Sequence, residues 1–175
     1  MAGSMTDYLE NAVLNLLLGN VSYSVPATVY FALYTTAPGE TGGGTEVTGG
    51  SYTRVAVTNN TTNFATVSNS TKRNSTAINF PTATADWGTV VAVGIFDALS
   101  AGNLLFYSTL DQNKVISNGD SASFSINAIT ITLDWWTLFH PYCFINYKHC
   151  PISHLLFNKR WDLYSAFPIA FPQSI

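Results

Sequence analysis

The chain has 175 residues, of which 47% are hydrophobic and only 10% are charged, and its formal net charge is −3. This length is enough for one domain of about 100–150 residues with its own core, plus an additional segment. The charged share lies far below the roughly 25% of an ordinary soluble protein. Because a nucleic-acid-binding surface needs clustered basic residues, seven of them against ten acidic ones argue against that class of partner.

The composition changes at Asp134, and we call residues 1–134 the body and residues 135–175 the arm. The body holds four basic and nine acidic residues, whereas the arm holds three basic and one acidic. Both cysteines, all three histidines and three of the four tryptophans lie in the arm. The first residues lack a basic region, and the apolar run at residues 12–18 is short, so we expect synthesis in the cytoplasm and no membrane partner.

The body begins with a helix signal. Thr6 and Asp7 are good N-cap residues, and Glu10 follows Asp7 by three positions. Four apolar residues then share one helical face before Gly19 and Asn20 end the pattern, namely Leu9, Val13, Leu16 and Leu17. We therefore predict an amphipathic helix over residues 7–18.

After Pro26 the hydrophobic period changes to two, which is typical of strands with one buried face. Val29, Phe31 and Leu33 alternate with three residues that we expect on the other face. Similar short runs predict further strands at residues 52–58, 61–68, 77–80, 90–97, 103–109, 121–126 and 128–133.

Turn-forming residues separate these runs, at residues 37–39, 42–44, 49–50, 59–60, 101–103 and 118–120. About eight evenly spaced strands without intervening helices indicate an antiparallel arrangement. We therefore expect a mainly β fold, an antiparallel β-sandwich or barrel with one short N-terminal helix, followed by an irregular arm.

The body offers little for catalysis, because it contains neither histidine nor cysteine. Four aspartates lie at or beside predicted turns, where side-chain hydrogen bonding is their ordinary role, namely Asp86, Asp97, Asp111 and Asp120. The glycines at residues 42–44 lack the lysine and helix of a phosphate-binding loop and predict a hairpin loop. Trp87 could stack on a sugar, but we favour a place in the core. We expect no enzyme and no cofactor.

The arm contains residue types that can bind a metal, namely His140, Cys143, His149, Cys150 and His154. Their spacing lacks the two close ligand pairs of structural zinc, so we predict no metal site. Whether the two cysteines form a disulfide stays open.

Aromatic side chains are the notable feature of the arm, because eleven of its 41 residues are Trp, Tyr or Phe. Four prolines interrupt any long helix there. Either the arm is a clamp that docks aromatic anchors on a neighbouring protein, or it is an extension without a role, and we favour the clamp. The candidate partner-binding residues are Trp135, Trp136, Phe139, Tyr142, Phe144, Tyr147, Phe157, Trp161, Tyr164 and Phe167.

Several motifs of the body are also similar to a known family. They include TDYLEN at residues 6–11, PATVYFALYTTAP at 26–38, residues 45–47 and 52–60, INFPTATADWGTV at 78–90, GIFD at 94–97, and residues 102–107 and 133–134. In this order they resemble a family of small bacteriophage virion proteins that are usually labelled tail-fibre-like. Similar small proteins serve as capsid cement or decoration proteins on phage heads. The resemblance covers residues 5–134 and leaves the arm outside.

The resemblance implies a structural part of a virion. A fibre shaft would show repeats or heptads, and the chain has none, so we favour a capsid cement or decoration protein on the outer surface of the head. Its expected partners are the major capsid protein or other virion proteins, together with further copies of the chain. The alternative is a tail-associated module that binds a host receptor, and an enzyme that degrades polysaccharide is a distant third.

Overall fold

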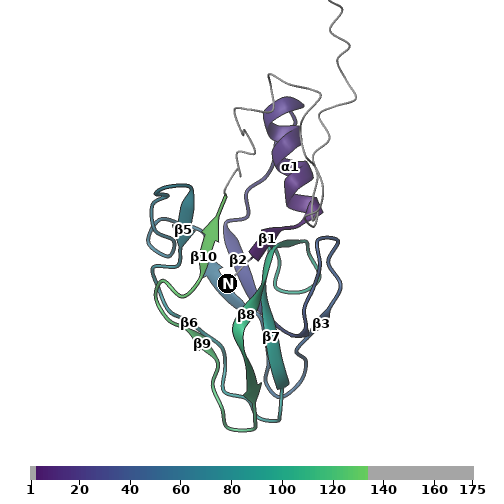
Figure 1. The fold of residues 1–175 in the computed structure, drawn as a ribbon, viewed down its shortest axis with the longest axis vertical. Coiled ribbons are helices and arrows are strands. Elements are labelled where there is room, and N and C mark those ends of the chain that lie inside the picture. The colour runs from purple at the N-terminus through teal and green to yellow at the C-terminus, as the bar shows by residue number, and fades with distance from the viewer. Residues whose placement is uncertain (1–2, 134–175) are drawn as a thin grey trace, which may run out of the picture. The chain divides into compact units, whose positions relative to one another are not determined.

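The computed structural model describes residues 3–133 and shows them as a mainly β unit with one helix (Figure 1). In chain order the elements are β1 (Gly3–Met5), α1 (Asp7–Leu18), β2 (Thr28–Thr36), β3 (Thr45–Glu46), β4 (Val55–Thr58), β5 (Thr71–Arg73), β6 (Ile78–Asn79), β7 (Gly88–Phe96), β8 (Leu104–Ile116), β9 (Ser123–Phe124) and β10 (Thr130–Thr132). The arm lies outside the described residues, so its predicted irregular structure and its boundary at residue 134 stay predictions.

A central antiparallel sheet has the strand order β1-β8-β7-β2-β3, and β4 shares the outer edge of β2 with β3. Two separate antiparallel ribbons pair β10 with β5 and β6 with β9. The predicted mainly β, antiparallel fold with an N-terminal helix is confirmed. The barrel alternative is wrong, because the end strands β1 and β3 do not pair with each other and the sheet stays open.

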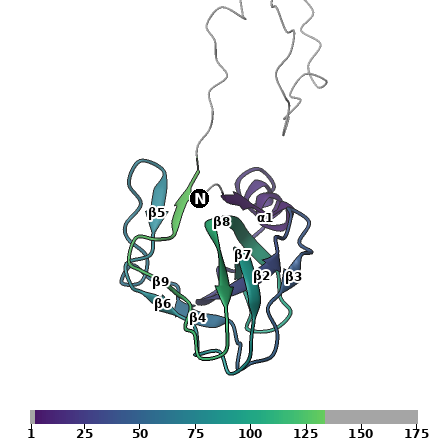
Figure 2. The same cartoon turned by 60° about the horizontal axis from the view of Figure 1, so that its bottom comes forward.

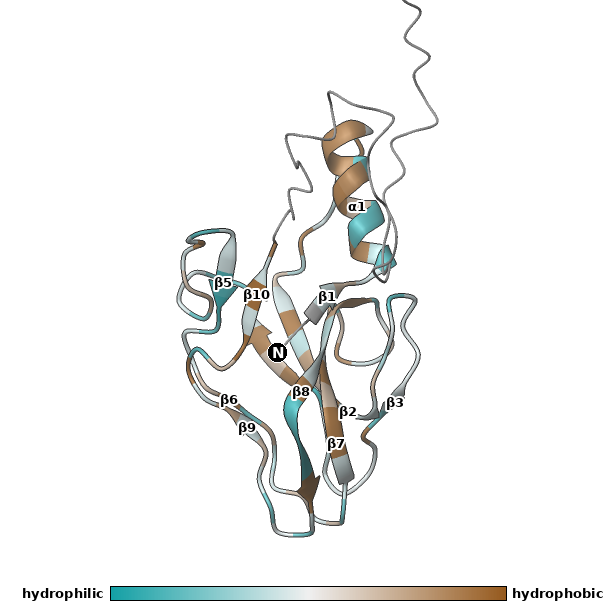
Figure 3. Cartoon of the chain, viewed as in Figure 1, coloured by the Kyte–Doolittle hydropathy of each residue, from teal (hydrophilic) through white to brown (hydrophobic). Residues whose placement is uncertain are grey.

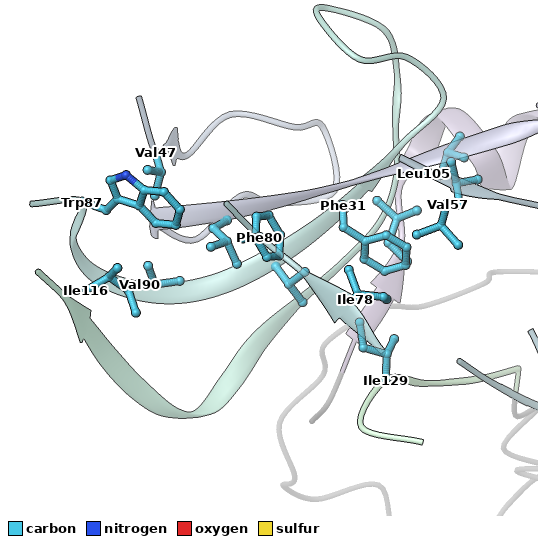
Figure 4. Close-up of a cluster of buried hydrophobic side chains, with 14 of the residues drawn as sticks. Phe31, Val47, Val57, Ile78, Phe80, Trp87, Val90, Leu105, Ile116 and Ile129 are labelled. Carbon is cyan, nitrogen blue, oxygen red and sulfur yellow. The ribbon is translucent and has the colours of Figure 1, made fainter. Parts of the chain in front are cut away.

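The main core lies between one face of this sheet and the ribbons and loops that cover it (Figures 2 and 4). Phe31, Val90 and Leu105 come from three neighbouring strands of the sheet, and Ile78 of β6 and Ile129 before β10 pack against the same cluster. Burying a large apolar side chain stabilises a fold by about 1.5–3 kcal/mol. Segments with weak strand patterns are therefore held in place by what they bury.

The opposite face of the sheet has a smaller core of its own. Ala32, Tyr34, Ala92, Phe96 and Leu104 form a second buried cluster there. The predicted alternation along β2 therefore holds only near its start, because Ala32 and Tyr34 are as buried as the residues of the main core. A strand that is covered on both faces loses the period of two.

The strand predicted at residues 61–68 is wrong. This segment forms a turn, in which the Oδ1 atom of Asn60 accepts hydrogen bonds from the backbone N–H groups of Thr62 (3.0 Å) and Asn63 (2.9 Å). Phe64 then enters the main core and stacks on Phe31, with ring centroids 6.4 Å apart. A hydrogen bond from a polar side chain to the backbone just after it thus stabilises a turn here, in spite of the strand propensity of the segment.

Most other strand predictions are confirmed in place but not in length. β6, β9 and β10 are two or three residues long, shorter than predicted, and β4 begins three residues later. β8 instead runs on to Ile116 because it pairs with β7 as far as Gly88, with a register shift between Val90 and Ala92. Three strands were not predicted at all: β1, β3 and β5. The predicted turn segments at residues 37–39, 42–44 and 118–120 do lie between strands.

Helix α1 has the predicted bounds, but its N-terminus is held differently from the prediction. The Thr6 side chain makes no cap hydrogen bond within the helix. Its hydroxyl instead donates to the backbone oxygens of Leu104 and Leu105 at the start of β8, and Thr6 is buried. Within residues 3–133, no helix has the length and hydropathy that a membrane crossing would need.

Candidate functional site

The ten aromatic residues predicted to bind a partner all belong to the arm, which lies outside the described residues. The same holds for the histidines and cysteines that were weighed as metal ligands. Among residues 3–133, no three His, Cys, Asp or Glu side chains come together as a metal site would require. The candidate surfaces described below therefore belong to the body.

Three of the four aspartates act at turns, as predicted. Asp97 accepts hydrogen bonds from the backbone N–H and the side-chain amide of Asn103, both at 2.7 Å. The carboxylates of Asp86 and Asp120 each accept a backbone N–H at 2.8 Å. Asp111 differs, because it lies within β8 and not beside a turn.

Trp87 belongs to the core and is only 5% exposed. Its indole N–H donates to the backbone oxygen of Gly50 (2.9 Å), and its ring meets Tyr52 edge-on with centroids 5.4 Å apart. The core position favoured from the sequence is confirmed, and no face of this ring is free for a sugar. The neighbouring turn depends on glycine, because Gly50 has φ of 52° and a Cβ there would lie 2.9 Å from the indole nitrogen.

A buried polar network lies beside the smaller core. The Arg54 guanidinium forms a bidentate pair with Glu46, with Nε to Oε1 at 2.9 Å and Nη2 to Oε2 at 2.8 Å. Its Nη1 donates to the backbone oxygens of Ala98 (2.9 Å) and Ala101 (2.8 Å). The guanidinium carbon also lies 3.5 Å from the ring centroid of Phe96. The network thus ties together β3, the segment before β4 and the loop after β7.

Tyr52 extends this network into the sheet. Its hydroxyl donates to Oε1 of Glu46 (2.9 Å) and accepts the backbone N–H of Leu33 (2.9 Å). Burial raises the pKa of Tyr52, and burial together with the charge of Glu46 raises the pKa of Tyr34 to about 12. For Arg54, burial lowers the pKa, but the hydrogen bond and charge of Glu46 outweigh this effect and the pKa is raised. These groups keep fixed charge states at neutral pH, which suits a structural clamp and not proton transfer.

An uncharged groove of about 240 Å³ lies between β1, β8 and β10. Its apolar lining includes Val93, Ile95, Phe106 and Ile129, and no charged side chain contributes to it. Leu133, the last described residue, is one of its lining residues. Such a groove fits an apolar or extended peptide segment better than a charged small molecule.

A second hollow of about 510 Å³, which has charged side chains in its lining, lies where α1 begins. Asp7 and Glu40 contribute carboxylates, and Tyr8 and Tyr34 contribute aromatic rings. Glu40 is already engaged, because it accepts a hydrogen bond from the Ser4 hydroxyl at 3.3 Å. The pKa of Tyr34 is raised, so its hydroxyl stays neutral and can donate or accept hydrogen bonds here.

The comparisons with known proteins decide the family. A family model described as podophage GP4 fiber I protein gp80 matches residues 4–132, which is 129 of the 175 residues. The chain belongs to this family. No curated protein matches it. Membership in the gp80 family makes the chain a structural protein of a phage virion and confirms the resemblance found in the motifs.

The match to the gp80 family covers nearly all of the candidate site described above. The second hollow, the Arg54 network, helix α1 and all residues of the first groove except Leu133 lie within residues 4–132, whereas the arm does not. Sequence reasoning missed the network. One signal could have found it, because Arg54 is the first basic residue of the chain and lies among apolar strands. Such an isolated arginine needs a partner when it is buried.

Proposed function

We propose that this protein is a small structural subunit of a virion fibre. The observation that carries the proposal is the match of nearly all described residues to a family of fibre proteins. A compact β body supports such a role, because a subunit of this kind works by presenting stable surfaces to other virion proteins. Repeats and heptads are absent from the sequence, so the subunit fits an attachment or terminal piece better than an elongated shaft.

We further propose that the protein works without catalysis. Three charged groups of the body help to hold the fold together: Arg54 and Glu46 in the bidentate pair, and Asp97 with Asn103. A general acid or base needs a group whose pKa lies near the working pH. The raised pKa values of Tyr34 and Tyr52 lie far above it.

Capsid cement is the second candidate. It is favoured by the absence of any repeat from which a fibre shaft could be built, and its partner would be the major capsid protein. The two candidates share the coarser property of binding other virion proteins. They differ in where the protein sits and in how many copies each particle carries.

Copy number and position separate these candidates. We would quantify the protein in purified virions against the major capsid protein by mass spectrometry, and locate it with a specific antibody by electron microscopy. A fibre subunit predicts copies in the range of the tail proteins and label at the tail. Copies comparable to the capsid subunits with label over the head would overturn the fibre proposal and support cement. Virions that lack the protein would refute both.

A further inference from the structure

The end of helix α1 and the loop after it present an apolar surface that the body leaves open. We call this surface the helix patch, and it consists of Leu16, Leu17, Leu18, Val21 and Val25, which are 47%, 71%, 85%, 55% and 66% exposed. Figure 3 shows the apolar colour concentrated on the second half of α1, away from the sheet. None of its five residues is charged.

The helix is attached to the body by its N-terminal end and by Leu9 and Val13. Leu9 is buried, and Val13 packs partly against the main core. The backbone N–H groups of Thr6 and Asp7 bond to the oxygens of Leu105 and Glu40, both at 3.0 Å. The core-facing stripe predicted from the sequence therefore holds for Leu9 and Val13 but not for Leu16 and Leu17. An exposed apolar surface of this kind is normally covered by another surface.

Charge narrows the choice of partner. The chain has no lysine or arginine before Arg54, and the first turn of α1 carries Asp7 and Glu10. Helices that bind anionic lipid surfaces need basic residues on their polar face, so a membrane is a poor partner. A strongly acidic or basic protein surface would gain no ion pair from the helix patch. A second neutral, apolar surface fits it, and the same patch on another copy is such a surface.

Geometry permits this pairing. In an antiparallel arrangement two copies bring their patches together while the acidic first turns point apart. Twelve helical residues span about 18 Å, roughly twice the Debye length at physiological salt, so repulsion between the acidic turns is screened. The exposed fractions of the five side chains correspond to about 500 Å² of accessible surface per copy, which is the size of the largest functional patches on monomers.

We propose that the helix patch binds the same patch on a second copy of this chain. Two copies would bury about 1,000 Å², which is near the lower limit for a specific interface. The association is therefore weak and concentration-dependent in solution, and it becomes effective where virion assembly gathers many copies. The inference rests on α1 itself and holds for either a fibre or a head location.

The test compares two double variants of the full chain with the wild type. Leu17→Lys/Leu18→Lys places two charges in the helix patch, keeps helix propensity, and sets the cations favourably at the helix C-terminus. Val67→Lys/Ile126→Lys places two charges on other surfaces at residues that are both 58% exposed. Sedimentation equilibrium over a range of concentrations measures the dissociation constant of each. We expect at least a tenfold increase for the helix variant and less than a twofold change for the control.

Several results would overturn the proposal. They are a wild type that stays monomeric at high concentration, a helix variant that still self-associates, or a control that loses association equally. Thermal melting guards against misfolding, because the helix variant should melt like the wild type diluted to monomer. A lower melting temperature would show that the leucines are covered within a single chain.

Discussion

Replacing Arg54 by methionine should be among the most damaging single changes in the body. The change keeps an apolar stem but removes the charge. The Glu46 side chain, which is only 24% exposed, then loses its bidentate partner. Breaking a buried ion pair from one side costs about 3–5 kcal/mol, and partial exposure of Glu46 reduces this. The contact with the Phe96 ring adds about 0.5–2 kcal/mol. We therefore expect a loss of about 3 kcal/mol.

Thermal and urea unfolding of the wild type and Arg54→Met would measure this loss. For a domain of this size, about 3 kcal/mol corresponds to a fall in Tm of roughly 10 °C. Arg54→Lys should lose part of it, about 1–2 kcal/mol, because an ammonium cannot hold both Glu46 oxygens and the two backbone oxygens together.

A double-mutant cycle isolates the pair. Arg54→Met combined with Glu46→Leu should be less destabilised than the two single changes predict together, with a coupling energy of about 2 kcal/mol, because no charge is then left buried alone. The reasoning is refuted if Arg54→Met melts within about 2 °C of the wild type. Additivity of the two changes within about 0.5 kcal/mol would contradict it as well.

Three further predictions concern other parts of the chain. In the folded state the pKa of Tyr34 is raised to about 12, and the pKa of Tyr52 is raised too. The free energy of unfolding that these neutral phenols contribute should therefore be fully present below pH 10 and be lost as the pH rises toward 12. Absorbance at 295 nm should show the two phenols ionising only when the protein unfolds. Asn74→Asp should lower the free energy of unfolding by about 3 kcal/mol at pH 7, and part of this loss should be recovered at low pH. The reason is that Nδ2 of Asn74 donates to two backbone oxygens, which would face a carboxylate in the variant. Urea unfolding at the two pH values measures the difference. Removal of the arm after Asp134 should leave a folded body, seen as a cooperative thermal transition with the circular dichroism of a β protein, that no longer enters virions; normal incorporation would show that the arm has no binding role.

The elements with strong local signals could be predicted from the sequence. The bounds of α1 follow from the period of its apolar residues and the stop at Gly19 and Asn20. β2 and β7 follow from long runs of β-branched and aromatic residues. The turns follow from glycine, asparagine and proline, which adopt the required backbone angles.

Elements that depend on distant contacts could not be predicted. β5 pairs with β10 across more than fifty residues, and nothing in the sequence Thr71-Lys72-Arg73 indicates a strand. Asn74 shows the same limit. It is 1% exposed, and its Oδ1 accepts the backbone N–H of Ile129 at 2.9 Å, so an ordinary loop residue by sequence joins two distant segments. The Arg54 network was missed for the same reason, because Ala98 and Ala101 contribute only backbone oxygens.

The strands at the two ends of the central sheet affect how readily the protein could aggregate by strand pairing. β1 has three residues and β3 only two, so these end strands themselves provide few free backbone groups on which another chain could grow as an added strand. β1 pairs with β8 only at Phe106–Ser108, however, and no described strand covers the outer edge of β8 from there to Ile116. Virion proteins accumulate to high concentration before assembly, where runaway strand pairing would be a hazard. The short end strands limit this pairing at their own edges, and the uncovered edge of β8 is the place in the body where an added strand would pair.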